Sequence, residues 1–237
     1  MKNRKITIAL LFGGRSAEHE VSLISAAAVY KNINRKKFNV QSIFIDKQGR
    51  WKKVSSPLLP PQRLAAGRSL SFLPWENAGA GGRPFHADIY FPVLHGPYGE
   101  DGTLQGLLEM ADVAYVGAGV LGSAIGMDKV VMKSVFASRN LPVVKYRRFL
   151  DREWRSDRNS IVAMVKGEFG LPFFVKPANL GSSVGISKVK SYVETAEALN
   201  LAFRYDRKVL VEEGIIGREI ECSVLGNDSP RASLPGE

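Results

Sequence analysis

The stretch from Ile6 to Phe12 constrains the fold of this chain more than any other part. It is a continuous apolar run, and Gly13 and Gly14 follow it directly. A run of this kind is typical of a strand buried on both faces of a parallel sheet. Apolar residues then recur at helical spacing over residues 20–33, and a second strand is expected at residues 38–45. Strand, helix and strand in this order predict an α/β sheet.

The basic segment 1–5 ahead of this run makes the N-terminus resemble a secretion signal. The apolar run reaches only the lower length limit of such a segment, and the glycines with Arg15 are not a small-residue cleavage site. No later apolar stretch approaches the ~20 residues of a membrane helix. The single cysteine, Cys222, cannot form an internal disulfide. We therefore expect a soluble, cytoplasmic protein with no membrane partner.

Length and charge leave two classes of partner open. The 237 residues are enough for one large or two ordinary domains. Lys and Arg number 33 and Asp and Glu 23, which gives a net charge of +10 and suggests nucleic acid or an acidic ligand. The basic residues are scattered, with local clusters at 2–5, 35–37 and 147–158, and no RRM, KH or helix-turn-helix signature accompanies them. We therefore expect no nucleic-acid partner.

The amino-acid composition changes between Ser55 and Pro84, where prolines and a Gly-Ala-Gly-Gly run predict a surface insertion. A strand at 87–94, a helix at 103–111 and a short strand at 113–116 follow. Beyond a domain boundary near Val120, we expect helices at 128–138, 160–168 and 193–203 and strands at 143–149, 173–175, 186–189 and 209–211. Residues 218–225 alternate, with Ile220, Cys222 and Val224 on one face, and predict a further strand.

The segment from Lys176 to Gly185 is the most informative one for chemistry. It places a lysine at the end of an expected buried strand, followed by a small turn between Gly181 and Gly185. Successive backbone N–H groups in such a turn can form a concave anion site, which glycines let a phosphate approach. It is not a Walker A loop, because no Gly-Lys-Ser/Thr closes it and a strand follows. A plain hairpin turn remains the alternative.

A second cluster, from His95 to Gly106, combines a strand end, several glycines and a histidine with two acids. Ligands of α/β sheets bind outside the carboxyl ends of strands, where His95 is expected. A structural histidine is the alternative for His95. Glu100 and Asp101 can instead complement the dipole of the helix that follows, and we assign that role to Asp101.

Five more charged residues are candidates. Glu18 is expected at the same sheet edge, where it either holds a substrate ammonium or is an ordinary first-turn acid. Lys129 opens a helix, where a cation is unfavourable unless an anion offsets it, or else it is solvated. Glu212 and Glu213 end a strand, with Glu219 beyond; they either meet an adenine amino group and ribose hydroxyls or are solvated acids.

Several common site patterns are missing from the sequence. The three histidines and one cysteine form no zinc-binding pattern. Gly13 and Gly14 do not begin a Gly-x-Gly-x-x-Gly fingerprint, and no Gly-x-Ser-x-Gly elbow occurs. The glycine turn after Lys176 is therefore the main anion-site candidate.

Together these segments resemble the D-alanine–D-alanine ligases, members of the ATP-grasp superfamily. Five blocks carry the resemblance, in the family's order and over nearly the whole chain: residues 11–22, 95–106, 127–129, 174–185 and 211–219. The resemblance implies an α/β fold with an N-terminal parallel-sheet domain of pre-ATP-grasp, Rossmann-like type, followed by an α+β ATP-grasp domain. It implies a substrate-binding domain at 1–120 with the insertion 55–84, a central ATP-grasp domain at 121–212, and the start of a C-terminal ATP-grasp domain at 213–237.

The resemblance also implies the reaction. ATP phosphorylates the carboxylate of one D-alanine, and the amine of a second attacks the acyl phosphate. The products are D-alanyl-D-alanine for the peptidoglycan precursor, ADP and phosphate. This chemistry depends on positioning and charge neutralisation.

By position, the resemblance assigns most candidate residues to the nucleotide. The phosphate contacts are Lys129, Lys176 and the backbone of Ser182, Ser183 and Val184; the adenine contacts are Glu212 and the backbone of Glu213 and Ile215; the ribose contact is Glu219. Two catalytic residues are implied, Glu18 and Ser182. Glu18 binds the ammonium of the first D-alanine and links to Ser182 in a hydrogen-bonded relay, while His95 lies near the carboxylate of that D-alanine.

The family's magnesium-binding residues, an arginine for the tetrahedral intermediate and the loop over the second substrate all come later than Glu237. We therefore expect ATP with Mg²⁺ or Mn²⁺ as cofactors, metal ligands downstream of Glu237 and none in this chain, and a C-terminal ATP-grasp subdomain that is largely missing. The resemblance further suggests that these residues alone are inactive, that they are a fragment of a longer ligase, and that the full-length ligase is a homodimer.

Two rival functions stay open. One is another carboxylate–amine or depsipeptide ligase of the superfamily, such as a D-alanine–D-lactate enzyme, because the residues that choose the nucleophile belong to the closing loop. The other is a nucleotide-binding module without catalysis. Nucleotide binding without product formation would identify the second.

Overall fold

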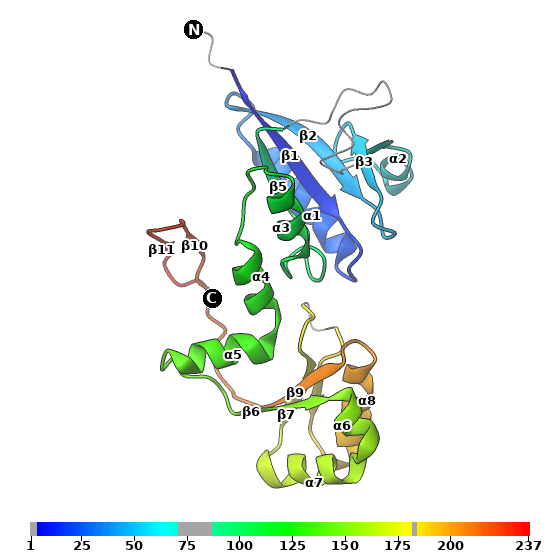
Figure 1. Ribbon diagram of the computed structural model, residues 1–237, viewed down its shortest axis with the longest axis vertical. Helices are drawn as coiled ribbons and strands as arrows, with labels where there is room; N and C mark the ends of the chain where they lie inside the picture. The colour runs from blue at the N-terminus through cyan, green and yellow to red at the C-terminus, as the bar shows by residue number, and fades with distance from the viewer. Residues whose placement is uncertain (1–3, 71–86, 182–183) are drawn as a thin grey trace.

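The computed structural model describes residues 4–70, 87–181 and 184–237. These residues form two sheets, one above the other in Figure 1, which are joined through two consecutive helices. An extended C-terminal stretch leaves the second sheet.

The first sheet has the strand order β4-β3-β2-β1-β5. At its centre, β1 (Ile6–Gly13) pairs in parallel with β2 (Phe38–Ile45) and β5 (Ile89–Pro92). Two antiparallel strands, β3 (Trp51–Val54) and β4 (Arg68–Leu70), extend the sheet beyond β2. The parallel α/β sheet predicted from the sequence is therefore confirmed, with an antiparallel edge added to it.

Both faces of β1 are covered, as the unbroken apolar run predicts. Leu10 and Phe12 pack in the cluster that includes Ala26 of α1 (His19–Asn32). Ala9 and Leu11 pack in the cluster that includes Leu104 and Leu108 of α3 (Thr103–Met110). Because the two sets alternate along one strand, the run has no position left for a polar residue.

The surface insertion predicted at 55–84 contains regular elements in its described part. Its first half contains α2 (Pro61–Ala65), whose Leu64 is buried in the core of the first sheet, and is followed by the edge strand β4. Residues 71–86 lie outside the described residues. The short strand expected at 113–116 is reduced to one bridge between Tyr90 and Tyr115.

The second sheet is antiparallel, in the order β6-β9-β7-β8. Its strands are β6 (Tyr146–Leu150), β7 (Phe173–Pro177), β8 (Ser187–Val189) and β9 (Lys208–Glu213). One face is covered by α6 (Asp151–Ser156), α7 (Arg158–Glu168) and α8 (Thr195–Phe203), preceded by a 3-10 turn at Tyr192–Glu194. The other face looks toward α5 (Figure 1).

Two helices connect the sheets. These are α4 (Val120–Met127) and α5 (Lys129–Ser138), separated by Asp128. The boundary predicted near Val120 coincides with the start of α4, and the division into domains stays a prediction.

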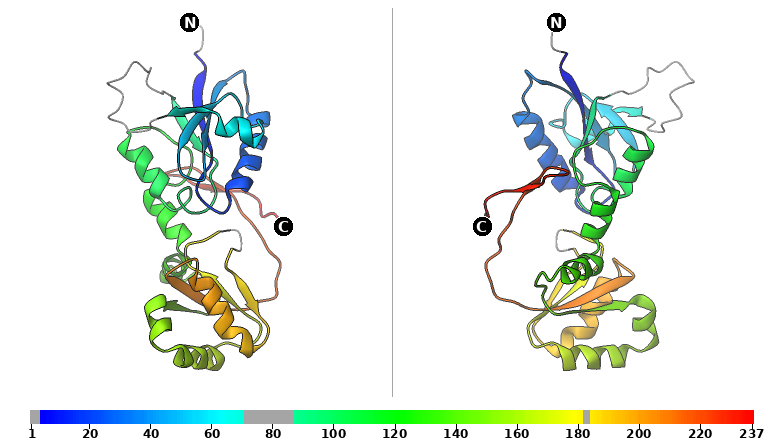
Figure 2. Two further views of the ribbon diagram at one scale, coloured as in Figure 1. Left: turned by 90° about the vertical axis from the view of Figure 1, so that its right-hand side faces the viewer. Right: turned by 60° about the vertical axis from the view of Figure 1, so that its left-hand side comes forward.

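The C-terminal stretch has little regular structure. It contains a small antiparallel pair, β10 (Val224–Leu225) and β11 (Arg231–Ala232), and in Figure 2 it bows away from the second sheet. The strand predicted at 218–225 is wrong for most of its length, since Ile220 is 47% and Val224 66% exposed and no core orders them. No helix in the described parts of the chain is long and apolar enough to cross a membrane.

Candidate active site

A cluster of charged groups lies on the face of the second sheet that looks toward α5. Along β9, Val209 and Val211 belong to the core under α6, α7 and α8, so Glu212 points to the opposite face. The same alternation on β7 places Lys176 on that face. The Lys176 Nζ lies 2.5 Å from Glu212 Oε2, and the Lys133 Nζ lies 2.9 Å from Oε1. Glu212 itself is only 5% exposed.

The two lysines keep this buried carboxyl ionised. Burial raises the pKa of Glu212, but hydrogen bonds and charge attraction from Lys176 and Lys133 outweigh it and hold the pKa below its usual range. The charges of Lys176 and Glu212 also act on Lys129. Burial lowers its pKa, and the positive charge of Lys176 lowers it further. Lys133 and Lys176 thus share the single negative charge of Glu212, while Lys129 lies nearby with Asp206 and Asp128 as further acidic neighbours.

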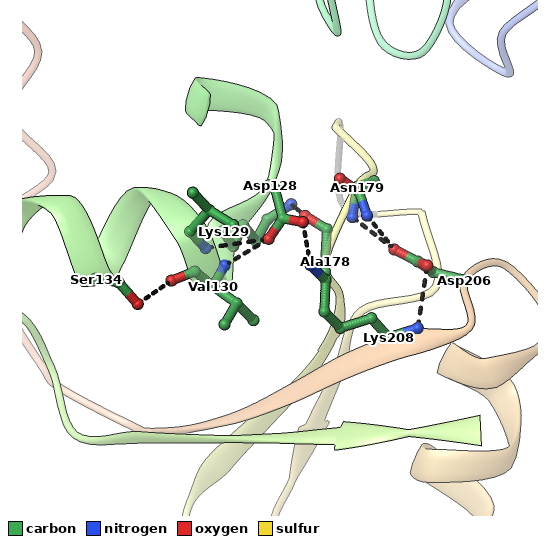
Figure 3. A network of polar contacts seen from close by, with 9 residues as sticks. Asp128, Lys129, Val130, Ser134, Ala178, Asn179, Asp206 and Lys208 are labelled. Atoms are coloured by element: carbon green, nitrogen blue, oxygen red, sulfur yellow. Dashed lines mark hydrogen bonds and ion pairs between the residues drawn. The ribbon is translucent and has the colours of Figure 1, made fainter. Parts of the chain in front are cut away.

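Lys129 is fixed at the start of α5 by a network that Figure 3 shows. The Asp128 carboxylate accepts hydrogen bonds from the backbone N–H groups of Val130 and Val131, each at 3.1 Å, and forms an ion pair with Lys208. The Lys129 backbone N–H donates to the Ala178 carbonyl at 3.1 Å. Because Ala178 directly follows β7 and leads into the glycine turn, this bond ties the start of α5 to the segment before the turn.

The side chain of Lys129 reaches over the same turn. Its Nζ donates a hydrogen bond to the Leu180 carbonyl. The other side of the turn is held by Asp206, which accepts from the backbone and side-chain N–H groups of Asn179 at 2.8 Å each. Ala178 and Asn179, which lead into the predicted anion-binding turn, are thus both held by hydrogen bonds, and Lys129 lies beside them.

The first sheet brings Glu18 to this turn. Glu18 is 8% exposed, although it precedes α1, and its side chain does not cap that helix. A Cβ added to Gly181 would lie 2.8 Å from Glu18 Oε2, and one added to Gly96 would overlap the same oxygen. The carboxylate therefore lies between the two glycine turns that the sequence singles out. This placement argues against an ordinary first-turn acid.

The rest of the second cluster is held by local hydrogen bonds. The His95 Nε2 lies 3.0 Å from Ser25 Oγ, and the Glu100 carboxylate accepts from the Gly96 N–H at 2.7 Å. Asp101 accepts from the Thr103 N–H at 3.0 Å, at the first residue of α3. The predicted helix-start role of Asp101 is confirmed, while the role of His95 stays open.

A cavity of about 630 Å³ lies where these parts meet. Its lining comes from the first sheet and its loops, from α4 and α5, and from the glycine turn, and it includes Leu94, Glu100, Lys129, Leu180 and Gly181. The size is ordinary for a small-molecule site. The cavity borders the loop at Glu100 on one side and Lys129 with the glycine turn on the other, while Glu18, Lys176 and Glu212 are not part of its lining.

The structure does not bring every candidate to this place. Ser182 and Ser183 lie outside the described residues, and the Val184 N–H donates to the Gly181 carbonyl at 3.3 Å. The Glu213 carboxylate instead accepts from the Lys145 N–H at 2.8 Å. Two further candidates are exposed on the C-terminal stretch, Ile215 and Glu219, and no described contact ties them to Glu212.

Sequence reasoning missed Lys133, which is 8% exposed and reaches Glu212 from α5. One signal could have found it. Lys133 follows Lys129 by four positions, so both lysines share a helix face, where like charges repel unless an anion lies between them. It also missed Asp206 and Lys208, which carry no pattern visible in the sequence.

Comparison with known proteins decides the family. A family model described as D-ala D-ala ligase N-terminus matches residues 7–118, and one described as D-ala D-ala ligase C-terminus matches residues 135–237. The chain belongs to the D-alanine–D-alanine ligase family. The resemblance stated from the sequence is therefore confirmed.

Named relatives agree. The D-alanine–D-alanine ligase of Bacillus licheniformis is 47% identical over 249 residues, covering 98% of this chain and 67% of that protein. The Bacillus velezensis ligase is 49% identical over 237 residues, covering 96% of this chain and 67% of that protein. This ligase chain thus spans about two thirds of the length of these relatives.

Solved structures confirm the ATP-grasp fold. The D-alanine–D-alanine ligase from Coxiella burnetii matches with a TM-score of 0.88 at 38% identity, covering 98% of this chain and 70% of that one. The VanG D-Ala:D-Ser ligase from Enterococcus faecalis matches with a TM-score of 0.80 at 35% identity, covering 98% and 69%. Ligation of two D-alanines is the function of the family, which uses ATP and a divalent metal ion and serves peptidoglycan synthesis.

The described residues fit the nucleotide better than the metal ion. The ammonium groups of Lys129 and Lys176 near a glycine turn suit a polyphosphate. In contrast, residues 4–70, 87–181 and 184–237 contain no group of three or more His, Cys, Asp or Glu side chains that could hold a metal ion. No step is therefore assigned to the metal on these residues.

Proposed function

We propose that the cavity between the two sheets is where this ligase activates D-alanine with ATP. Lys129 and Lys176 bind the phosphates, together with the backbone of Ser183 and Val184, and the carboxylate of Glu212 accepts a hydrogen bond from the adenine amino group. The backbone of Glu213 and Ile215 completes the adenine site, and Glu219 binds the ribose. Transfer of the γ-phosphoryl group to the D-alanine carboxylate gives the acyl phosphate, which the second amine attacks.

The contact between Glu18 and Gly181 is the observation that carries the proposal. It joins the candidate ammonium site at the end of β1 to the candidate phosphate turn after β7. A carboxylate at this position attracts the ammonium of a D-alanine, and the turn beside it supplies N–H donors for the transferred phosphoryl group. The reaction needs these two sites to be neighbours, since the substrate carboxylate attacks the γ-phosphorus directly.

The remaining roles follow from the same placement. Ser182 links Glu18 to the turn in a hydrogen-bonded relay, and His95 lies near the carboxylate of the first D-alanine. Because the lysines and the turn neutralise the negative charge that develops, they act through electrostatics rather than by proton transfer. The metal ions are Mg²⁺ or Mn²⁺ in this proposal. We further propose that the ligase works in the cytoplasm as a homodimer; sedimentation velocity tests the dimer.

Replacement of Lys176 by alanine tests the proposal. Affinity for ATP is measured by calorimetry on the protein as its gene encodes it, with Lys166→Ala on the exposed face of α7 as the matched loss of one positive charge. We expect Lys176→Ala to weaken ATP binding by about tenfold or more, because a charge-assisted contact is lost. Equal ATP affinity in the two variants would contradict the phosphate role. Product assays with D-alanine and D-lactate as competing nucleophiles separate the ligase from a depsipeptide enzyme.

A further inference from the structure

Lys133 is a buried lysine that the proposed reaction does not use. It is the buried residue of α5, and its ammonium group reaches across to the second sheet. There it forms the ion pair with Glu212 and lies 5.5 Å from the centre of the Tyr146 ring. A lysine is rarely buried unless its charge has a partner, so the position is built around this contact.

The surroundings of Glu212 show what the contact does. In the strand register, Tyr146 of β6 lies opposite Glu212 on one side and Phe174 of β7 on the other. The carboxylate thus emerges between two aromatic residues and has two lysines as its cationic partners. Each oxygen takes one of them, Oε1 from Lys133 and Oε2 from Lys176.

Lys176 and Lys133 differ in whether they also belong to the proposed phosphate site. Lys176 is part of the phosphate site in the proposed function, so a nucleotide draws its ammonium group away from Oε2. Lys133 comes from α5 and holds Oε1 from the other side. A carboxylate has about four lone-pair sites, so Oε2 then has room for an N–H donor of the base.

We infer that Lys133 is a positioning residue for nucleotide recognition: it holds Glu212 as the acceptor for the adenine amino group while Lys176 binds phosphate. The inference rests on the proposed function, because it requires Glu212 to face the base. It also assigns specificity. A fixed carboxylate accepts from the amino group of adenine and repels the carbonyl oxygen that guanine carries at the same position.

Steady-state kinetics on the protein as its gene encodes it test this role. The variants are Lys133→Met, which keeps the length and removes the charge, Lys133→Arg, Glu212→Gln and the double variant Lys133→Met with Glu212→Gln. Lys166→Met is the matched control, since Lys166 is exposed on α7 and has no ion pair among the described residues. Thermal midpoints report on folding, and Lys133→Gln carries the same test if Lys133→Met does not fold.

We expect Lys133→Met to raise the KM for ATP about tenfold, the size of one lost charge-assisted contact, and to change kcat and the KM for D-alanine less than about twofold. The preference of the Lys133→Met variant for ATP over GTP falls. The Lys133→Arg variant keeps most of the ATP affinity and most of this preference. Since Lys133 acts through Glu212, the double variant is no worse than Glu212→Gln alone. The inference is overturned by an unchanged KM for ATP in Lys133→Met, or by effects that multiply in the double variant. If Glu212→Gln itself leaves the KM for ATP unchanged, the adenine role in the proposed function fails instead.

Discussion

Replacing Gly181 by alanine should press directly on the Glu18 carboxylate. The new Cβ would lie 2.8 Å from Oε2, 3.3 Å from Oε1 and 3.4 Å from Cδ of Glu18. The first contact is shorter than real Cβ atoms show, and the side chain, 8% exposed, has little room to retreat. Overpacking of this kind costs about 1–3 kcal/mol, which corresponds to about five- to 140-fold in a binding constant. The backbone at Gly181 has no positive φ, so the effect is steric.

The assay compares the KM for the first D-alanine with the thermal midpoint. We expect Gly181→Ala to raise this KM by about tenfold or more through displacement of Glu18, with a smaller change in the KM for ATP. Gly106→Ala is the matched control, because a Cβ there meets no atom within 4 Å and alanine favours helix α3. Gly181→Ala behaving like Gly106→Ala in both measurements would refute the contact between the two sites.

Two other outcomes are expected. Glu18→Gln should raise the KM for the first D-alanine far more than that for ATP, because the ammonium loses its counter-charge; equal effects in a two-substrate kinetic analysis would count against this role. Because the pKa of Glu212 is held below its ordinary value of 4.5, its ion pairs stabilise the fold fully above that pH and are lost as pH falls through the lower pKa of the folded state. Thermal midpoints of Glu212→Gln and the parent should therefore converge below about pH 4.5, and a constant difference would contradict the ion pairs.

The parallel core was predictable from the sequence because one physical signal dominates it. From Ile8 to Phe12 the run that became β1 has no polar residue, and a strand covered on both faces leaves no place for one. The glycine turn after Lys176 was predictable for a similar reason, since its residue types point to close backbone approach. That Glu18 would lie against Gly181 needed the family resemblance, because nothing local relates residues this far apart in the chain.

The errors have physical causes as well. Prolines around residues 57–61 predicted a surface insertion but did not reveal its helix: Pro61 starts α2, where its missing N–H costs nothing, and Leu64 packs in the core. The alternation at 218–225 predicted a strand, but alternation stabilises a strand only when one face has something to pack on. Ile220 and Val224 find no such surface among the described residues.

The three lysines near the glycine turn differ in how readily they can bind an added anion. Lys133 and Lys176 are both bound to a full negative charge on Glu212, whereas Lys129 donates to the neutral carbonyl of Leu180. Burial lowers the pKa of Lys129 and the charge of Lys176 lowers it further, and together these outweigh the opposite effect of Glu212, Asp206 and Asp128. In the proposed function, a phosphate beside Lys129 would offset the repulsion between Lys129 and Lys176. Because that repulsion is one reason for Lys176 to stay on Glu212, phosphate binding at Lys129 favours transfer of Lys176 as well. In the proposed function we therefore expect a nucleotide to engage Lys129 before Lys176, with Lys133 left in place to hold the carboxylate.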